Sequence, residues 1–452
     1  MDKHQRLVIV ISILASFVAF LDGSVVNVAL PAISHELGGG LLIQQWVSDA
    51  YLITLGTLIL AAGSLSDIFG RRKILTVGLY GFLLTSLLCA ISPSGEFLVI
   101  SRALQGISGA LLVPSSLALI ISVFSGAAQA KAIGTWTAWT GIAFIIGPLV
   151  GGLMVDLLSW RLVFAINIIP IIVALWLMRS LHLKDELSTR KKVDTVGIIL
   201  GAIGLGGIVY ALIEQANYRW SSPLIYGTFA IGLVALATFI WHESRTKQPM
   251  LPLELFHTRN FSVGNVATFF IYGALALQGF VLVIFLQQTA GYPATLAGLT
   301  TIPLTIIMFF LSSRFGALSG KYGPRLFMGL GPIISGIGVI LLLRVNVPAN
   351  YWTELLPGIV VFGLGLSMTV APLTSAILGS IKASQAGIGS AVNNAVARIA
   401  GLLSVAVIGV FIGTQMTLNG FHEGIVICAI LLVAGGTVSA IGIQNNLSKS
   451  QK

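Results

Sequence analysis

The sequence predicts an all-α polytopic membrane protein with 14 transmembrane helices. Three observations lead to this fold class: the composition, the number of long apolar runs, and the way basic residues are distributed between those runs. Of 452 residues, 56% are hydrophobic and 9% are charged, whereas soluble domains carry about 25% charged residues. With a mean hydropathy of +0.97 the chain cannot cover a water-facing surface.

Long apolar runs recur along the whole chain. A helix needs about 20 predominantly apolar residues to cross roughly 30 Å of hydrocarbon, and we count fourteen runs of this kind. The first six are Leu7–Leu30, Trp46–Leu65, Lys73–Ser92, Phe97–Phe124, Ala132–Val155 and Arg161–Arg179. Two shorter, Gly-rich runs follow a charged linker, Val193–Ile213 and Pro223–Trp241. The last six are Phe261–Leu286, Thr295–Leu318, Arg325–Leu343, Glu354–Gly379, Gly387–Gly413 and Phe421–Ile443.

Basic residues test this count and orient the chain. With the N-terminus in the cytoplasm, nineteen of the 25 lysines and arginines fall in segments on the inside, and only Arg161, Arg219 and Arg344 fall outside. Such an excess is typical of cytoplasmic loops. The first run carries Asp22 and lacks an Ala-x-Ala cleavage site, so we expect a retained span. We therefore expect a multi-pass protein of the plasma (cell inner) membrane, with both termini cytoplasmic. We expect it to contact the lipid bilayer and not to bind nucleic acid.

Two loop segments repeat one another. Gly63-Ser-Leu-Ser-Asp67-Ile-Phe-Gly70-Arg71-Arg72 follows the second span, and Gly316-Ala-Leu-Ser-Gly320-Lys-Tyr-Gly323-Pro324-Arg325 follows the tenth, at a constant offset of 253. Two six-helix halves related in this way are typical of secondary transporters, whose substrate site lies between the halves. We expect an N-terminal six-helix bundle over 1–183, a linker with two additional transmembrane helices over 184–259, and a C-terminal bundle over 260–452.

Ordered motifs in the first half make a resemblance specific. Gly63-x-Leu-x-Asp67-x-x-Gly70-Arg71-Arg72 resembles the loop signature of the major facilitator superfamily, and fourteen spans resemble its drug:proton antiporter branch of the EmrB/QacA kind. Four further motifs agree with that branch: Leu21-Asp22-Gly-Ser-Val-Val-Asn27-Val-Ala-Leu-Pro31, Arg102-Ala-Leu-Gln105-Gly106 with Gly109, Gly141 followed by Gly147-Pro148-Leu-Val-Gly151-Gly152, and Trp160-Arg161 with Phe164 and Asn167-Ile-Ile-Pro170. The resemblance implies the major facilitator fold, and proton-driven efflux by alternating access.

Charged residues inside spans are the candidates for proton coupling. A carboxylate in hydrocarbon costs about 2.5–3.5 kcal/mol on insertion scales, so it is rarely without a role. We expect Asp22 to carry the proton or to neutralise a cation; the alternative is a structural carboxyl group bonded to Asn27 or Ser24. Asp49 is a second candidate, or else a solvated helix-end residue. Arg102 must face a partner or a water-filled cavity. The resemblance implies that it tunes the acid, with Gln105 one turn away in the same network.

The first copy of the repeated loop is the candidate gate. The resemblance implies that Gly63, Asp67, Gly70, Arg71 and Arg72 form a latch that closes the inward mouth, although the basic residues also set topology. The second copy has Gly320 in place of the acid, so we expect the latch to be asymmetric. In the fifth span the resemblance assigns Gly141, Gly147, Pro148, Gly151 and Gly152 to an antiporter motif, although small residues also simply permit close helix packing.

Substrate recognition is less well defined by the sequence. The residues we expect to line a cavity are Asn27, Tyr51, Gln105, Trp139, Tyr272, Gln278, Asn394 and Arg398. Arg314 and Arg398 are the charges that we expect to be buried in the second half, where no mid-membrane acid occurs. An apolar cavity with few acids suits lipophilic compounds, and Asp22 and Asp49 favour cationic ones.

Other functions receive less support. One alternative keeps the fold and exports a single metabolite, such as an amino-acid derivative, a siderophore or an organic anion. An enzyme or a channel is not indicated, because the six histidines lie in loops or at span ends and no charge ring or repeated filter occurs. We expect no cofactor and no metal site, a small-molecule substrate exchanged against protons, and a monomer.

Overall fold

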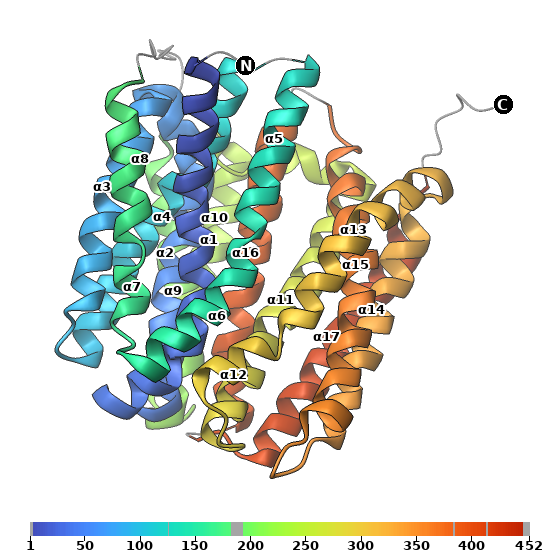
Figure 1. Cartoon of the computed structure of the whole chain (residues 1–452). Coiled ribbons are helices and arrows are strands. Elements are labelled where there is room, and N and C mark those ends of the chain that lie inside the picture. Colours follow the sequence, from blue (N-terminus) through green and yellow to red (C-terminus); the bar gives the residue numbers. More distant parts are fainter. Residues whose placement is uncertain (1–2, 125, 182–192, 383–384, 413–414, 446–452) are drawn as a thin grey trace. The chain divides into compact units, whose positions relative to one another are not determined.

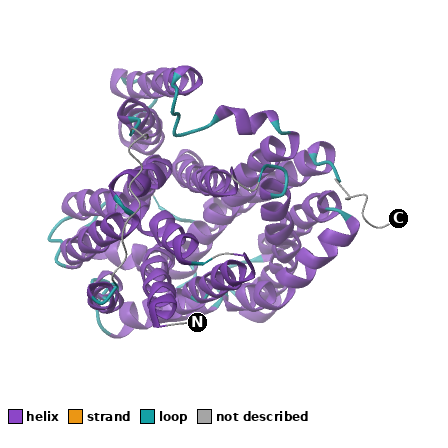
Figure 2. Cartoon of the chain, turned by 90° about the horizontal axis from the view of Figure 1, so that it is seen from above, coloured by secondary structure: helices purple, strands orange, loops and turns teal. Residues whose placement is uncertain are grey.

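The computed structural model describes residues 3–124, 126–181, 193–382, 385–412 and 415–445 (Figure 1). In this part of the chain, 14 helices are long and apolar enough to cross a membrane, and each overlaps one predicted span. Figure 2 shows helices and loops only among the described residues. The predicted all-α, 14-span architecture is therefore confirmed. Some helices run further than the apolar runs, for example to Leu37 where the first run ended at Leu30.

The helices group into two compact units. Unit 1 comprises residues 1–251 and 293–298, and unit 2 comprises 252–292 and 299–452. Unit 1 contains α1 (Lys3–Leu37), α2 (Gly40–Phe69), α3 (Arg71–Ala90), α4 (Gly95–Val123), α5 (Gly126–Gly141), α6 (Ala143–Leu157), α7 (Leu162–Ala165), α8 (Ile168–Arg179), α9 (Thr195–Tyr218) and α10 (Pro223–Arg245), and all of α12 (Ala294–Leu299) except its last residue.

Within unit 1, α4 packs against α1, α2 and α3, and α6 packs along α1. The two additional helices, α9 and α10, pack on each other, and α9 packs on α2; we call them the accessory pair. At one end of α9, Trp46 Nε1 donates to Glu214 Oε1 at 2.8 Å. Toward the other end, Ala61 of α2 and Phe239 of α10 share an apolar cluster with Met250. The accessory pair is thus held to α2 near both ends.

Unit 2 contains the remaining helices. Its elements are η1 (Leu253–His257), α11 (Arg259–Gln288), α13 (Ile302–Tyr322), α14 (Pro324–Leu341), η2 (Leu342–Arg344), η3 (Tyr351–Leu355), α15 (Leu356–Leu378), α16 (Ala386–Ile412) and α17 (Leu418–Gly442). α14 packs against α15 and α17, and α11 packs against α16 and α17.

Short polar signals begin several of these helices. The side chains of Ser94, Asp194 and Thr417 each accept a hydrogen bond from a backbone amide in the first turn of the helix that follows. Such N-caps satisfy amides that have no partner within the helix. A break at Ile142 divides the predicted fifth span into α5 and α6. The sequence signals therefore set where the helices begin, and the helices place the polar side chains described next.

Candidate functional site: a buried charge network in unit 1

The centre of unit 1 holds a buried ion pair. Arg102 on α4 and Asp22 on α1 are joined through a 2.6 Å contact between Nη1 and Oδ2, with side chains 2% and 0% exposed. Removing two opposite charges from water is costly, and close contact between them offsets that cost only when the remaining polar atoms are also bonded. The surrounding side chains meet this requirement.

Neutral polar groups complete the environment of Asp22. Its Oδ1 atom accepts from Gln105 Nε2 at 3.2 Å and from Asn167 Nδ2 at 3.0 Å. Gln105 Oε1 in turn accepts from Arg102 Nη1 at 2.6 Å, and Gln105 Nε2 donates to Ser86 at 2.9 Å. Three helices and the residue before α8 therefore meet around one carboxylate: α1 carries Asp22, α4 carries Arg102 and Gln105, and α3 carries Ser86, which accepts from Gln105.

Arg102 also connects the network to α2. Its Nε atom donates to the carbonyl oxygen of Val47 at 3.0 Å, and its guanidinium lies 4.3 Å from the ring centre of Tyr51. Phe164, in α7, lies on another side at 5.7 Å. The charge of Arg102 is thus held by one carboxylate, the side-chain oxygen of Gln105, one backbone carbonyl and two aromatic faces.

Two sequence expectations concerning Asp22 have different outcomes. The structure brings Gln105 into contact with Arg102 and Asp22, as the spacing suggested. Ser24 is not a partner of Asp22, because its hydroxyl donates to the carbonyl oxygens of Leu21 and Ala143. The amide that bonds Asp22 comes from Asn167, far along the sequence, instead of Asn27.

Asp49 on α2 is placed differently. Its side chain is 0% exposed, and neither carboxylate oxygen has a hydrogen-bond partner among the described residues. It lies on α2 between Val47 and Tyr51, the two residues that contact Arg102. An unpaired charge in such a position is strongly disfavoured. Asp49 is therefore a buried acid with free capacity for a proton on either oxygen.

The repeated loop adopts the same turn in both copies. Gly70 joins α2 to α3 with φ 97° and ψ 133°, and Gly323 joins α13 to α14 with φ 86° and ψ 152°. Both have positive φ, which glycine adopts without strain. Arg72 donates to the Met178 carbonyl at 3.4 Å, near the end of α8. Gly63 has open space around its α-carbon. Arg71 lies at the start of α3, and the side chain of Asp67 is outside the described part of the structure. The latch role thus remains a prediction.

Two glycines of the fifth span, Gly147 and Gly151, face α1 next to Asp22. A β-carbon on Gly147 would lie 2.0 Å from Ser24 Oγ, and one on Gly151 would lie 2.4 Å from Val25 Cγ2. A β-carbon on Gly152 would meet the backbone of Thr295 at 2.5 Å. Gly141, by contrast, has open space, and Pro148 lies inside α6. The close approach of α6 to α1 therefore requires Gly147 and Gly151.

The residues predicted to line a cavity lie on different helices and differ in burial. Tyr51 and Gln105 belong to the charge network, and Asn27 is half-buried on α1. Trp139 is 55% exposed. In unit 2, Gln278 is buried, Tyr272 and Arg398 are half-buried and interact electrostatically, and Asn394 donates to the Ser390 carbonyl of its own helix. The expectation that Arg314 is buried is wrong: its side chain is exposed on α13.

Two carboxylates that sequence reasoning missed make well-formed contacts. Asp156, at the end of α6, accepts from the backbone amides of Ala294 and Thr295 at 2.9 and 2.7 Å, which begin α12. Glu36, near the end of α1, accepts from Trp160 and Arg161 at 2.7 and 2.6 Å. Both are acids at span ends, which sequence reading treats as solvated. Trp160 and Arg161 belong to the motif at the start of the sixth span, but that motif does not indicate that Glu36 is their partner.

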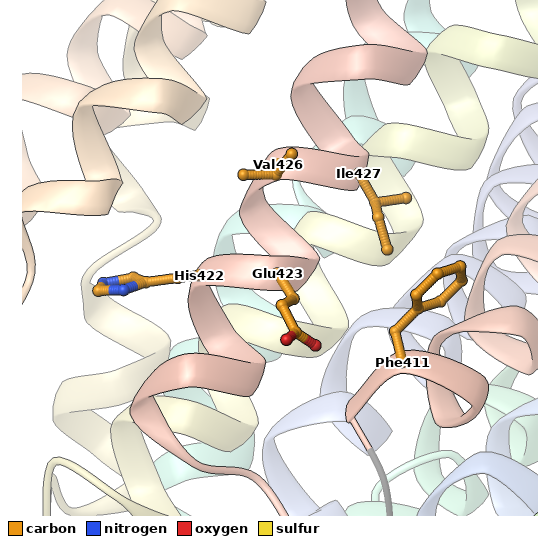
Figure 3. Close-up of a pocket in the computed structure, with 5 residues that line it drawn as sticks. All are labelled: Phe411, His422, Glu423, Val426 and Ile427. Carbon is orange, nitrogen blue, oxygen red and sulfur yellow. The ribbon is translucent and has the colours of Figure 1, made fainter.

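A separate pocket of about 340 Å³ lies in unit 2 (Figure 3). It is lined by Phe411 of α16 and by His422, Glu423, Val426 and Ile427 of α17, and the His422 side chain points away from Phe411. His422 Nε2 lies 3.1 Å from the Val345 carbonyl oxygen. The pocket contains none of the predicted site residues, so we place the candidate site at the charge network.

Residues 12–405 match the sequence profile of the Major Facilitator Superfamily. The chain belongs to this superfamily. It is a multi-pass membrane transporter for small molecules and not an enzyme.

Relatives of similar length are resistance and export proteins. The chain is 32% identical to the Methylenomycin A resistance protein of Bacillus subtilis (strain 168), over 91% of this chain and 88% of that protein. It is 33% identical to the Puromycin resistance protein pur8 of Streptomyces alboniger, over 90% of this chain and 82% of that protein. Fourteen spans and these relatives confirm the drug-resistance branch that the motifs resemble. A crystal structure of the peptide transporter POT in complex with sulfate has the same fold, with a TM-score of 0.72, 14% identity, and coverage of 97% of this chain and 94% of that one.

Proposed function

We propose that this superfamily member is a proton-driven exporter of lipophilic cationic compounds that works by alternating access. Three findings support the proposal. The relatives include the Multidrug transporter protein MdtP of Bacillus subtilis (strain 168), 32% identical over 90% of this chain and 75% of that protein. The buried acids of unit 1 provide proton sites, and the glycines of α6 match an antiporter motif. The distribution of basic residues supports a cytoplasmic location for both termini.

The observation that carries the proposal is the unpaired carboxyl group of Asp49. Asp22 is already neutralised by Arg102 at 2.6 Å and accepts two further hydrogen bonds. Asp49 is equally buried and has no donor among the described residues. A buried carboxyl group without a partner is neutral when a proton is available. Asp49 is therefore better suited than Asp22 to bind and release the transported proton.

Exchange follows if a proton and a cationic substrate compete for Asp49. When the proton leaves, the negative charge of Asp49 attracts a cation, and when the proton returns the cation is released. Arg102 senses the change, because it is bonded to Val47 and stacked on Tyr51, on either side of Asp49. The ion pair with Asp22 keeps Arg102 from neutralising Asp49 permanently. The electrical part of the proton gradient supplies about 2.3 kcal/mol per charge per 100 mV.

The test uses purified protein in proteoliposomes and a lipophilic monocationic dye such as ethidium. Uphill dye movement is driven by an imposed pH gradient, and downhill exchange is measured without one. We expect Asp49→Asn to abolish uphill movement and to weaken downhill exchange, because it removes both the proton site and the negative charge that attracts the cation, while the ion pair of Asp22 and Arg102 stays intact. Asp22→Asn should reduce both, because it leaves Arg102 buried without its counter-charge.

The proposal has clear contrary outcomes. Uphill movement by Asp49→Asn at the wild-type rate would show that another group carries the proton. Loss of uphill movement in Asp22→Asn alone, with downhill exchange intact, would move the proton to Asp22. A wild-type protein that shows no response to the pH gradient would contradict proton coupling.

A second function on the same fold is the export of one organic anion. Two observations favour it. Arg398 lies on α16 and interacts electrostatically with Tyr272, and the described buried polar side chains of unit 2 carry no acid. One relative is named a Probable actinorhodin transporter, in Streptomyces coelicolor (strain ATCC BAA-471 / A3(2) / M145). Inhibition of dye movement by anionic but not cationic competitors, and its loss in Arg398→Gln, would favour this function.

A further inference from the structure

A second pair of buried acids lies at one end of the accessory pair, away from the network around Arg102. Asp194 immediately precedes α9, and Glu243 lies in the last turn of α10. The Asp194 side chain is 6% exposed, and Glu243 is 2% exposed. Both lie in unit 1, at the end of the accessory pair that joins the segment 246–252. We call this segment the connecting segment, because it leads from α10 to η1 in unit 2.

Half of the carboxylate oxygens in this pair are bonded. Asp194 Oδ1 accepts from the Gly197 amide at 2.9 Å and lies 2.9 Å from His242 Nε2. Glu243 Oε2 accepts from the Leu251 amide, in the connecting segment, at 2.9 Å. The other two oxygens, Asp194 Oδ2 and Glu243 Oε1, are buried and accept no hydrogen bond from a described residue.

The two unbonded oxygens converge. Each lies 2.7 Å from the position that a β-carbon on Gly197 would occupy. A proton on either one lets Asp194 and Glu243 form a hydrogen bond. Without that proton, two buried acceptors are unsatisfied and two negative charges face each other, which is strongly disfavoured.

We propose that Asp194 and Glu243 bind one proton between them, and that this proton holds the connecting segment against the accessory pair. The site is separate from Asp22, Arg102 and Asp49. Its ligand is a proton from the side of the membrane that we predict to be cytoplasmic.

The proton resides on Glu243. Burial opposes ionisation of Asp194, but hydrogen bonds from the Gly197 amide and His242 more than compensate, so the pKa of Asp194 lies below its ordinary value. Asp194 is therefore the ionised partner, and Glu243 donates from Oε1 to Asp194 Oδ2. The other oxygen of Glu243 remains free to accept from Leu251.

Among the described residues of unit 1, the charged groups next to the pair in sequence are exposed, so solvent screens them. They are Arg245 on α10 and Lys247 in the connecting segment. His242, on the opposite oxygen of Asp194, is half-buried. From α2, Leu60 and Ala61 contribute apolar groups to the neighbouring cluster; the side chain of Asp67, further along α2, is outside the described part.

Loss of the proton frees the connecting segment. Without the proton, the two carboxylates are both negatively charged and their unbonded oxygens face each other, so they repel. Glu243 then turns away, and the Leu251 amide loses its acceptor. Leu251 also packs on the cluster of Ala61, Phe239 and Met250, which is the other attachment of the segment. The boundary between the two units falls directly after Leu251. If the proposed alternating access holds, movement of the units involves this segment and becomes sensitive to pH; the proton site itself does not depend on that function.

Hydrogen exchange of the connecting segment tests the site in the full-length protein, reconstituted in lipid nanodiscs. Protection of the peptide that contains Leu251 is measured at pH 6 and pH 9 and corrected for the intrinsic exchange rate. We expect wild-type protection to be at least tenfold lower at pH 9. Glu243→Gln should be protected at both pH values, because an amide donates to Asp194 and still accepts from Leu251. Glu243→Ala should be unprotected at both.

Two further variants sharpen the test. Gly197→Ala places a methyl group between the two carboxylate oxygens. Because these oxygens are the ends of flexible side chains, they can move apart while the fold is retained. We therefore expect low protection of the Leu251 peptide at both pH values. Glu214→Gln, at the other end of the accessory pair, is the matched control and should follow the wild type.

The proposal is overturned if wild-type protection does not depend on pH, or if Glu243→Gln or Gly197→Ala reproduces the wild-type profile. Because the readout is protection and not transport, failure here is distinguishable from failure of the proposed function. A protein that moves no dye against a pH gradient but shows this profile retains the site and refutes proton-driven export.

Discussion

The buried interior of unit 1 includes the ionisable side chains of Asp22, Asp49, Arg102, Asp194 and Glu243, whereas the described buried polar side chains of unit 2 are all neutral. In unit 2 the corresponding polar cluster joins α11 to α16. Asn393 Nδ2 donates to Asn265 Oδ1 at 3.2 Å and to Thr268 Oγ1 at 2.8 Å. The polar cluster in the interior of unit 1 is therefore built around an ion pair, whereas that of unit 2 consists of hydrogen bonds between neutral side chains.

The same units share their loop geometry closely. Gly70 and Gly323 both have positive φ, and the arginine two residues later donates to a carbonyl near the end of its unit's last bundle helix: Arg72 to Met178 and Arg325 to Ala440. A cation at a helix C-terminus is favourable. The internal repeat thus preserves the backbone turn and the arginine contact but not the buried charges. If the proposed function holds, the response to protons therefore belongs to unit 1.

The largest expected effect comes from breaking the ion pair. Asp22→Asn or Arg102→Gln alone should lower the free energy of unfolding by about 3–5 kcal/mol, because each leaves one buried charge without its partner. The double variant should recover most of this loss, since neither charge remains. Denaturant unfolding of the purified protein in detergent measures it. Single variants as stable as the wild type would show that unit 1 does not depend on the pair.

The next effect concerns the packing of α6 on α1. Gly147→Ala should reduce transport at least tenfold, because the new β-carbon would lie 2.0 Å from Ser24 Oγ and would force α1, which carries Asp22, away from α6. Gly141→Ala belongs to the same motif but enters open space, so it should transport normally. Dye efflux at matched expression measures both.

A rescue variant separates packing from any other property of Gly147. Adding Ser24→Ala to Gly147→Ala removes the hydroxyl that clashes and leaves the Ser24 β-carbon position 3.0 Å away. Partial recovery of efflux supports the steric explanation. Equal loss in Gly141→Ala would instead point to a need for flexibility along the whole motif.

The sequence predicted the spans and the repeat well because both depend on local properties, namely apolar length and positive-φ glycines. It also singled out Asp22 and Arg102 as charges within apolar runs, which are visible without a structure; their role in proton coupling stays a prediction. It did not predict that Asn167 bonds Asp22, or that Asp49 lacks a partner, because those facts depend on how distant helices pack. Arg314 was misjudged for a related reason. Its place in an apolar run does not determine which face of α13 it occupies.

The neutral cluster of unit 2 gives a smaller effect. Asn393→Ala should cost about 1–3 kcal/mol of stability, because Asn265 and Thr268 lose a buried partner. The ratio of pH-driven to downhill dye movement should not change, since no charge is involved. Measuring that ratio together with thermal unfolding distinguishes the two units. A changed ratio would mean that unit 2 also takes part in proton coupling.

The smallest effect is expected when the missing acid is restored to the second loop. Gly320 lies in the last turn of α13 with open space around it, so Gly320→Asp fits without a clash. An acid near a helix C-terminus costs about 0.3–1 kcal/mol, and Lys321 beside it offsets part of that cost. The start of α14 is already bonded, because the Arg325 amide donates to Asn445 Oδ1 at 3.1 Å. Efflux should therefore stay within about twofold of the wild type, whereas the reciprocal change Asp67→Gly should reduce it several-fold. Equal effects of the two changes would show that the loops act symmetrically and would remove the functional difference between the units at this position.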